Sequence, residues 1–378
     1  MPPRIIDVRQ AEDSRDTVHR AVQALVEGQL VGFPTETVYG IGASACHAPA
    51  VEKLAATKGR GYGSPFALAI KSAAEALDYV PSMSPLAQRL ARRCWPGPVT
   101  LVVEVGEQPG LASHLPVEVR PFVIPAGWVG LRVPASKIMQ DVLRMIAGPL
   151  ALTSANRTGE PDAVDAKGVV EAVGDHLALV LDDGPARYRQ PSTVVRVTGN
   201  QFEILREGVV RESTMERLTS YLVVVVCTGN TCRSPMAEAF LRRQLAERLG
   251  CAEAQLESRG VIVASAGISA AAGAPASPEG VQVMHKKGLD LTRHESQQLT
   301  EQLVRHADLI LTMTRGHRQT ILNQWPEVAE RVAVLLASGR DVADPLGSPY
   351  EAYVACAEQI EQAVAHRVEQ IVAEVSGE

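Results

Sequence analysis

The sequence has no excess of positive charge, because 37 lysine and arginine residues stand against 43 aspartate and glutamate residues, a formal net charge of -6. This excludes the strong basic field that drives non-specific nucleic-acid binding, although a local basic cleft is still allowed. No apolar run approaches the roughly 20 residues that span a bilayer, and the first residues lack the apolar core of a signal peptide. These absences predict a cytoplasmic protein with no membrane contact.

Cysteine is also scarce. The spacing of the cysteines does not suggest a disulfide framework, and none has the neighbours of a zinc site; they are Cys46, Cys94, Cys227, Cys232, Cys251 and Cys356. We therefore predict no protein metal site. Only Cys227 and Cys232 stand in a pattern that suggests chemistry.

The length of 378 residues is enough for two domains of ordinary size, each with its own core. We expect the first domain over residues 1–212 and the second over residues 221–378. Between them, residues 213–220 read as a short polar connection without a Pro/Gly-rich spacer. A connection this short restricts the relative motion of the domains.

The second domain opens with an apolar run, Leu222–Val226, that has the length of a buried strand. A polar turn follows, and Met236–Leu249 has the periodicity of a helix. Ser234 suits the N-cap and Pro235 the first helical position, so amides of the turn and the helix N-terminus would face one anion. Cys227 stands in this positive potential, which favours a thiolate nucleophile.

The rest of the second half alternates strands with helices. Strands are expected at Gly260–Ala264, Ala307–Thr312 and Val332–Leu336, and the helices between and after them include Pro278–Lys287 and Tyr350–Val375. This alternation predicts a doubly wound parallel sheet, whose ligands bind at the carboxyl ends of the strands. Cys227 and Asp344 both lie at such ends.

The first half begins with the helical pattern Asp16–Glu27 and the strand Leu30–Phe33, and a further helix is expected at Ala50–Ala56. Several short motifs are weak individually, since each also fits an ordinary turn or surface. In chain order they are PTETVYGIG (34–42), KGR (58–60), WPGPVT (95–100), RVP (132–134), TSAN (153–156), PSTVV (191–195) and LREG (205–208).

In this order and spacing the motifs resemble the threonylcarbamoyl-AMP synthases, the Sua5/YrdC family, over about residues 5–210. The resemblance implies a twisted mixed-sheet α/β domain. It also implies an enzyme that joins L-threonine, bicarbonate and ATP, with Mg²⁺, into threonylcarbamoyl-adenylate and pyrophosphate for the modification of an adenosine in tRNA. Downstream tRNA-modifying proteins would be its partners, and contact with tRNA would be indirect or weak.

The reaction gathers negative charge on every participant, so preorganised cations are the main contribution that a protein can make. By resemblance, Lys58 and Arg60 hold ATP phosphates or the threonine carboxylate, and Arg132 and Arg206 face anionic groups. Hydroxyl and amide groups complete the threonine and nucleotide pocket: Thr35, Thr100, Ser154, Asn156 and Ser192.

Two features of the first half depart from the family pattern. Ser64 stands where the family often has a lysine or asparagine, and the preceding loop is Gly61-Tyr62-Gly63. The Pro-rich stretch 106–127, just before Trp128, is expected to be a long lid or surface loop. An RNA-binding or regulatory module with a degenerate second domain is the rival interpretation of the whole chain.

The pattern Cys-x5-Arg-Ser after an apolar strand, with Asp344-Pro345 near the C-terminus, resembles the low-molecular-weight protein phosphatases over about residues 221–375. The resemblance makes Cys227 the nucleophile, Arg233 the transition-state clamp and Asp344 the acid/base, acting on a phosphorylated protein without a cofactor. Asn230 would hold the loop and Ser234 would stabilise the thiolate. The phosphate loop comprises Thr228, Gly229, Asn230, Thr231, Cys232 and Ser234.

Thr231 bears on the substrate, because tyrosine-specific members usually carry an aliphatic residue there and aromatic residues after Asp-Pro. Here Leu346 and Gly347 follow Asp344-Pro345. The loop resembles more closely the bacterial protein arginine phosphatases, so phosphoarginine is favoured and phosphotyrosine stays open. An arsenate reductase-like domain is the alternative, but the cysteines that would relay a disulfide are missing. Cys232 is either a reversible disulfide partner of Cys227 or a small core residue.

Overall fold

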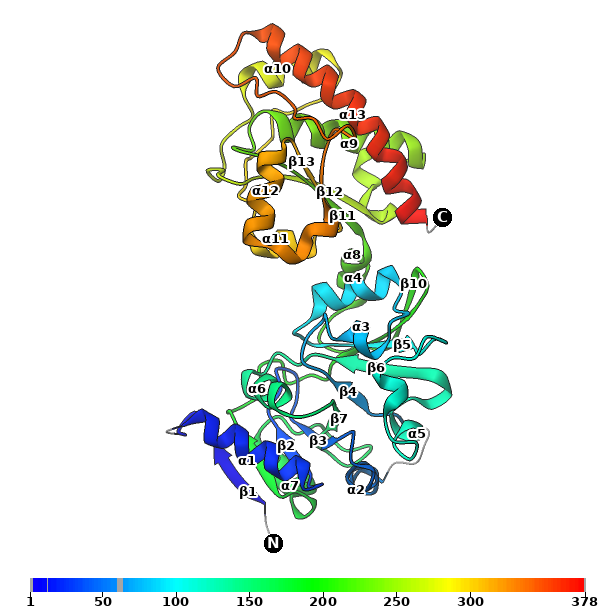
Figure 1. Ribbon diagram of the computed structural model, residues 1–378. Coiled ribbons are helices and arrows are strands. Elements are labelled where there is room, and N and C mark those ends of the chain that lie inside the picture. The colour runs from blue at the N-terminus through cyan, green and yellow to red at the C-terminus, as the bar shows by residue number, and fades with distance from the viewer. Residues whose placement is uncertain (1–2, 12, 60–63, 377–378) are drawn as a thin grey trace. The chain divides into compact units, whose positions relative to one another are not determined.

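The computed structural model describes residues 3–11, 13–59 and 64–376, and its chain divides into two compact units, Met1–Met215 and Glu216–Glu378. Each unit has its own sheet (Figure 1). Each also has its own apolar core. The division falls inside the stretch 213–220, where we expected a polar connection. Most of that stretch is helical, because α8 spans Glu212–Thr219 and buries Met215.

The first unit is built on one mixed sheet. Its strands are β1 (Arg4–Asp7), β2 (Val31–Phe33), β3 (Gly40–Ser44), β4 (Ala67–Ala69), β5 (Val99–Glu104), β6 (Trp128–Arg132), β7 (Leu150–Ser154), β8 (Leu179–Asp182), β9 (Thr193–Thr198) and β10 (Gln201–Arg206). They run across the sheet in the order β1-β8-β2-β3-β7-β4-β6-β5-β9-β10. Pairs such as β5 with β9 are parallel, whereas β5 with β6 and β3 with β7 are antiparallel.

Helices and short helical turns cover this sheet. They are α1 (Ser14–Val26), α2 (Ala48–Lys58), α3 (Ala76–Tyr79), α4 (Pro85–Cys94), η1 (Leu111–His114), α5 (Arg120–Val123), η2 (Pro125–Gly127), α6 (Lys137–Met145), α7 (Ala166–Val173) and η3 (Gly174–His176). The expected helices at 16–27 and 50–56 are confirmed with shifted ends. α1 begins after Asp13, whose carboxylate accepts a hydrogen bond from the Arg15 amide and so caps the helix.

One core of the first unit lies between the sheet and the pair α1 and α6. Both helices are amphipathic, and each contributes one apolar face. Their buried side chains pack against Phe33 of β2 and Leu150 of β7; from α1 and α6 they are Val18, Ala21, Leu25, Ile138, Met139, Val142 and Leu143. This packing fixes β7, which ends at the TSAN motif.

The stretch 106–127 is not the long lid or surface loop that we expected. It folds into η1, α5 and η2, and it buries Val119 and Val123. The Gly127 carbonyl accepts a hydrogen bond of 2.8 Å from the Val105 amide, so the two ends of the excursion are tied together. The apolar residues between the prolines explain why it packs against the sheet instead of extending into solvent.

The second unit has a parallel sheet of β11 (Tyr221–Cys227), β12 (Val261–Gly267), β13 (Leu309–Thr312) and β14 (Val332–Val334), in the order β12-β11-β13-β14. Its helices are α9 (Arg233–Leu249), η4 (Glu253–Gln255), η5 (Glu257–Arg259), α10 (Pro278–Lys286), α11 (Glu301–His306), α12 (Arg315–Gln324), η6 (Pro326–Arg331) and α13 (Tyr350–Ser376). The predicted fold class, a mixed-sheet α/β domain followed by a doubly wound parallel sheet, is confirmed.

The central strand β11 is buried on both faces, which explains its unbroken apolar run. Val223 and Val225 point into the core that contains α9 and α13, whereas Val224 and Val226 point into a second core with α11 and α12. Figure 1 shows these two pairs of helices on opposite sides of the sheet. β11 ends with Cys227 at the carboxyl edge, where the phosphate loop begins.

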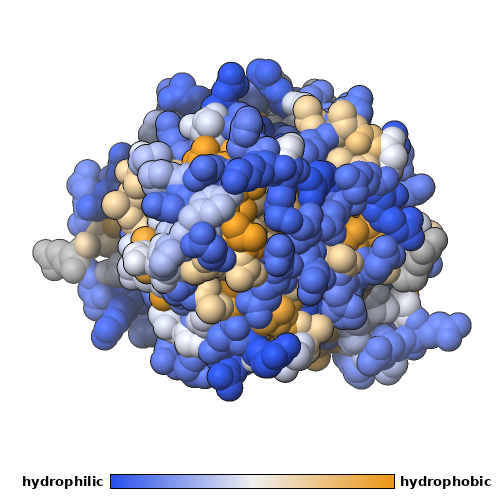
Figure 2. Space-filling model, turned by 90° about the horizontal axis from the view of Figure 1, so that it is seen from above, coloured by the Kyte–Doolittle hydropathy of each residue, from blue (hydrophilic) through white to orange (hydrophobic). Residues whose placement is uncertain are grey.

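Most of the face seen in Figure 2 is hydrophilic, and its apolar residues form small separate patches. Over the part of the chain that the structure describes, no helix combines the length and apolarity needed to cross a membrane.

Two candidate active sites

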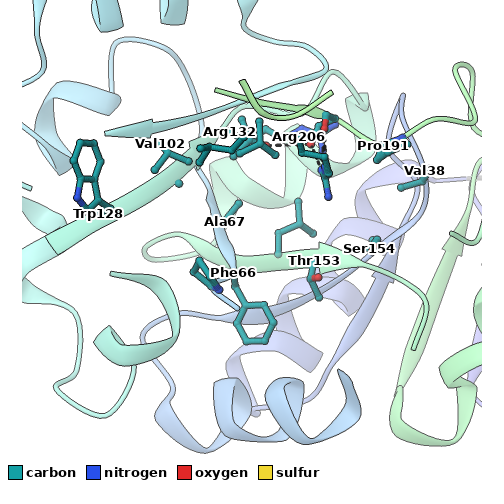
Figure 3. A pocket seen from close by; sticks show the side chains of 18 of the residues that line it. Val38, Phe66, Ala67, Val102, Trp128, Arg132, Thr153, Ser154, Pro191 and Arg206 are labelled. Atoms are coloured by element: carbon teal, nitrogen blue, oxygen red, sulfur yellow. Dashed lines mark hydrogen bonds between the residues drawn. The ribbon is translucent and has the colours of Figure 1, made fainter. Parts of the chain in front are cut away.

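A cavity of about 440 Å³ opens in the first unit among β5, β6, β7, β9 and β10. It is lined by most of the residues predicted from the sequence motifs: Thr35, Thr100, Arg132, Ser154, Ser192 and Arg206. In Figure 3 Trp128 lies at one end of the cavity and Ser154 at the other, with Arg132 and Arg206 between them. The fold therefore brings motifs from distant parts of the chain to one place.

Arg132 is held at the cavity wall by a buried ion pair. Its Nη2 donates to Glu36 Oε1 at 2.8 Å and to Thr37 Oγ1 at 2.9 Å, while the other carboxylate oxygen of Glu36 accepts from the Ala135 amide. The Arg132 and Glu36 side chains are only 8% and 9% exposed. Arg132 Nε is buried and has no hydrogen-bond partner among the described residues.

Arg206 forms a second group with Ser192 and Thr100. Its Nη2 donates to the Ser192 carbonyl at 2.8 Å and to Ser192 Oγ at 3.0 Å, and Ser192 Oγ lies 3.2 Å from Thr100 Oγ1. Gly208 allows this arrangement, since a Cβ there would overlap the Pro191 carbonyl oxygen and lie 2.6 Å from the Ser192 carbonyl carbon. The backbones of the PSTVV and LREG motifs thus pack directly against each other at Gly208.

Lys58 and Asn156 do not line the cavity but lie behind it. The Lys58 ammonium, almost fully buried, donates to Ser154 O at 2.9 Å, to Asn156 Oδ1 at 2.7 Å and to Asn156 O. Ser154 Oγ in turn donates to Asn156 Oδ1 at 2.6 Å. Lys58 therefore fixes the turn that presents Ser154. Arg60 and the loop 61–63 lie outside the described residues.

The cavity also has an apolar part that the sequence motifs did not identify. Phe66, Val102 and Trp128 line it, and the Arg196 guanidinium lies 5.3 Å from the centre of the Trp128 ring. Glu36 was missed as well, although it stands inside the PTETVYGIG motif. A cavity with arginines, hydroxyl groups and an apolar wall can bind a molecule that carries anionic groups together with a flat or apolar part.

The second site is the loop between β11 and α9. The Cys227 thiol is 2% exposed; its Sγ lies 3.0 Å from Ser234 Oγ and 3.2 Å from the Asn230 amide nitrogen. The expectation that Ser234 is the N-cap is wrong, because α9 begins at Arg233 with Cys232 as its N-cap. The Ser234 hydroxyl is drawn to the sulfur instead of to a backbone amide of the first turn.

Asn230 organises the loop from a buried position. Its φ of 56° lies in the left-handed region, which asparagine tolerates better than most residues. Its Nδ2 donates to Ser234 Oγ at 2.9 Å and to Ser265 Oγ at 2.8 Å, and its Oδ1 accepts from the Gln297 amide. These bonds join the loop to β12 and to the segment before α11.

Arg233 and Asp344 form an ion pair at the mouth of this site. The Arg233 side chain is 5% exposed and the Asp344 side chain 46%, so the aspartate is the partner that faces solvent. Arg233 Nη1 also donates to the Val342 carbonyl at 3.3 Å, and its Nε has no hydrogen-bond partner among the described residues. A thiol, a guanidinium and a carboxylate thus lie at the carboxyl edge of the sheet.

Two walls of the loop carry groups that sequence analysis missed. On one wall His317 Nε2 lies 2.9 Å from Thr228 Oγ1. On the other, Thr231 Oγ1 lies 3.6 Å from Cys232 Sγ, which lies 3.7 Å from the Tyr353 hydroxyl. Burial raises the pKa of Tyr353 to about 12, so this hydroxyl keeps its proton at neutral pH. In the sequence, His317 could have been noticed because it closely follows the end of the expected strand Ala307–Thr312.

Comparison with known proteins gives a match for each unit. The Sua5/yciO/yrdC family, described as telomere recombination, matches residues 23–208, and the low molecular weight phosphotyrosine protein phosphatase family matches residues 222–377. A putative threonylcarbamoyl-AMP synthase from Mycobacterium tuberculosis is 38% identical over 218 residues, which are 58% of this chain and 94% of the relative.

The second unit is similar to a probable low molecular weight protein-tyrosine-phosphatase, EpsP, from Ralstonia nicotianae. The two are 41% identical over 143 residues, which cover 38% of this chain and 90% of the relative. A solved structure of a P. abyssi Sua5 variant is 23% identical with a TM-score of 0.51, and the match covers 87% of this chain and 98% of that chain. This last likeness concerns the fold alone.

Proposed function

The chain belongs to the threonylcarbamoyl-AMP synthase family through its first unit and to the low molecular weight protein phosphatase family through its second, and from this we propose a fused enzyme with two active sites. The first unit joins L-threonine, bicarbonate and ATP into threonylcarbamoyl-adenylate and pyrophosphate. The second hydrolyses a phosphorylated protein through a phosphocysteine. We assign the first domain to residues 1–212 and the second to residues 221–378.

One observation carries the first assignment: two arginines lie among several hydroxyl groups around one cavity of about 440 Å³. Threonine, its carbamate and the nucleotide phosphates are all anions, so fixed cations stabilise both their binding and the transition state. We propose that Arg132 and Arg206 hold these groups directly and that Thr35, Thr100 and Ser192 line the threonine and adenylate pocket. Lys58, Ser154 and Asn156 form the phosphate-facing turn, and Arg60 completes the set.

ATP is the substrate, and we propose that it enters with Mg²⁺. Across residues 3–11, 13–59 and 64–376 no group of three or more metal-ligating side chains occurs, so phosphate oxygens and water would supply most of the ligands. The protein would then hold the phosphates through the arginines, while Lys58 positions Ser154. The mechanism proposed for the second unit uses no cofactor.

The second assignment follows from the meeting of Cys227, Arg233 and Asp344. The Cys227 thiolate attacks phosphorus while Arg233 holds the equatorial oxygens, and the bond to the leaving group breaks as Asp344 gives that group a proton. Water then attacks the phosphocysteine and returns its proton to Asp344, which releases phosphate and the thiolate. Ser234, with its hydroxyl 3.0 Å from the sulfur, stabilises that thiolate.

For the substrate of the second unit we propose phosphoarginine in preference to phosphotyrosine. Thr231 places a hydroxyl beside the loop, and a hydroxyl can bond to a guanidinium donor, whereas an aliphatic side chain cannot. Leu346, which is 67% exposed, and Gly347 follow Asp344-Pro345 and offer no aromatic ring to sandwich a phenyl group. Hydrolysis of phosphoarginine and phosphotyrosine peptides by wild type and Thr231→Ile tests this. An equal ratio of phosphoarginine to phosphotyrosine hydrolysis in both proteins contradicts a role of Thr231 in the preference.

The fusion is tested in the full chain by measuring pyrophosphate release while L-threonine, bicarbonate and ATP are omitted in turn. Release should require all three, and pyrophosphate formed without threonine or bicarbonate contradicts the assignment. Cys227→Ser should lose phosphatase activity to below about a thousandth and keep the synthase rate, because its hydroxyl is a weak nucleophile at neutral pH. Arg206→Ala should lower the synthase rate and leave the phosphatase activity unchanged.

We place the activities in the cytoplasm, with tRNA-modifying proteins as the consumers of the adenylate. Their reaction needs the threonylcarbamoyl group delivered to tRNA, so contact of this chain with tRNA itself would be indirect or weak. The net charge of -6 supports that proposal, since it offers no broad attraction to a polyanion.

A further inference from the structure

The floor of the cavity in the first unit changes character along β6. Side chains two positions apart on a strand point to the same face, and Trp128, Gly130 and Arg132 all line the cavity. Arg132 lies in the middle of the cavity, whereas the Trp128 ring lies at its end (Figure 3). Gly130 has no side chain, so the floor is bare between them. One strand therefore presents an aromatic surface and a cation to the same cavity.

A guanidinium joins the aromatic end from another strand. Val102 of β5 pairs with Gly130 on one side and with Arg196 of β9 on the other, so the three stand in one row across the sheet. The Arg196 guanidinium carbon lies 5.3 Å from the centre of the Trp128 ring. Glu203, opposite Arg196 on β10, lies 3.4 Å from its Nη1. Trp128 is half-buried and the Arg196 side chain is 41% exposed, so both have surface open to a ligand.

The three substrates proposed for the first unit differ in what they can place against this pair. Bicarbonate has no apolar part, and the side chain of threonine carries only a methyl and a hydroxyl group. ATP alone has a flat aromatic ring, and its phosphates lie on the other side of the ribose. Nucleobases stack both on aromatic rings and on guanidinium planes. The aromatic end of the cavity therefore matches the base of ATP.

We propose that Trp128 and Arg196 form a platform on which the base of ATP stacks, with the phosphates directed toward Arg132 and Arg206. The inference rests on the synthase activity proposed above and adds the residues that hold the base, which none of the sequence motifs contains. Stacking would fix one end of the nucleotide. It would thereby help to hold the α-phosphorus in place for attack by the carbamate.

Three substitutions in the full chain separate stacking from attraction between charges. Trp128→Leu removes the ring and stays apolar, whereas Trp128→Phe keeps an aromatic face. Arg196→Lys keeps the positive charge and loses the guanidinium plane. Inorganic tripolyphosphate is the probe matched to ATP, because it carries the anionic groups without a base. Calorimetry gives the Kd of each probe, pyrophosphate release gives the KM for ATP, and phosphatase activity with denaturant unfolding shows that the variants are folded.

We expect Trp128→Leu to weaken ATP binding roughly five- to hundredfold and Arg196→Lys roughly three- to tenfold, while Trp128→Phe stays within about fivefold of wild type. The Kd of tripolyphosphate should change less than about twofold in all three, since stacking needs a base. Equal losses for ATP and tripolyphosphate would show that this end of the cavity holds phosphate. Unchanged ATP binding in Trp128→Leu would show that no base stacks there.

Either of these two results overturns the platform. The synthase assignment itself is judged separately, on the wild-type protein. Pyrophosphate release that requires L-threonine, bicarbonate and ATP keeps that assignment even where the platform fails. A folded wild-type protein without such release overturns the assignment and, with it, the platform.

Discussion

Glu36 and Arg132 form a buried ion pair in which one carboxylate oxygen holds the guanidinium and the other accepts the Ala135 amide. The carboxylate thus ties the motif after β2 to the strand end of β6. Among the described residues, the buried Arg132 Nε has no hydrogen-bond partner. A negative charge in a site proposed for anions is counterintuitive, but here it orients the Arg132 guanidinium.

Glu36→Gln should lower synthase activity by a factor of about ten to a hundred, because the guanidinium loses its charged anchor inside a low-dielectric wall. Glu36→Ala should also lower the free energy of unfolding of the first unit by about 3–5 kcal/mol, since it leaves a buried charge unpaired. Pyrophosphate release and denaturant unfolding measure the two effects. Phosphatase activity is the internal control, and a Glu36→Gln protein with wild-type kcat and KM contradicts the positioning role.

A second prediction concerns Gly208, which packs directly against the backbone of residues 191–193. Gly208→Ala should cost about 1–3 kcal/mol of stability and most of the synthase activity, since the added Cβ pushes Pro191 and Ser192 away from Arg206. Gly199→Ala is the matched control. Gly199 has a φ of 57° and no atom within 4 Å of its Cβ position, so only backbone strain of about 1 kcal/mol is expected there. Equal activity in the two variants contradicts the argument.

The strands of the second unit could be predicted because a sheet buried on both faces leaves an unbroken apolar run in the sequence, as in β11. The start of α9 could not be predicted from the sequence. The Ser234 hydroxyl could have bonded to a backbone amide of the first helical turn or to the Cys227 sulfur, and only the structure shows that it lies beside the sulfur. The parallel sheet of the second unit was therefore accessible from periodicity. The helix boundary depended on the geometry of the loop.

In the first unit the motifs gave most of the cavity wall, but not the contacts that organise it. Glu36 and Arg132 are 96 positions apart, and Lys58 and Asn156 are 98 positions apart. Nothing local in the sequence pairs them. Trp128 and Arg196 were missed for the same reason: each reads as an ordinary strand residue until β6 and β9 flank β5.

Asn230 should be sensitive to substitution in a way that separates backbone strain from hydrogen bonding. Asn230→Ala loses its bonds to Ser234 and Ser265 and keeps a left-handed φ, so the second unit should lose about 3 kcal/mol. Asn230→Gly loses the same bonds without the strain and should be about 1 kcal/mol more stable than the alanine variant. Phosphatase rates should fall in both. Denaturant unfolding followed by phosphatase activity measures the difference, and identical midpoints show that the strain is absent.

The stability of the second unit should depend on pH through His317. Its pKa in the folded chain lies below the usual 6.5, so the unfolded chain binds a proton there more readily than the folded one. Above pH 6.5 the ring is neutral in both states and contributes nothing. As pH falls below 6.5 the unfolded state gains the proton first, and stability declines until the folded ring is protonated as well.

His317→Gln removes this group, so the fall in the free energy of unfolding between pH 7 and pH 5 should be smaller than in wild type. Arg233, Asp344 and Asp341 act on the ring and stay in both proteins, which makes the difference between the two pH profiles specific to His317. Denaturant unfolding of the second unit at closely spaced pH values gives the two profiles. Parallel profiles would show that the folded ring titrates as freely as the unfolded one.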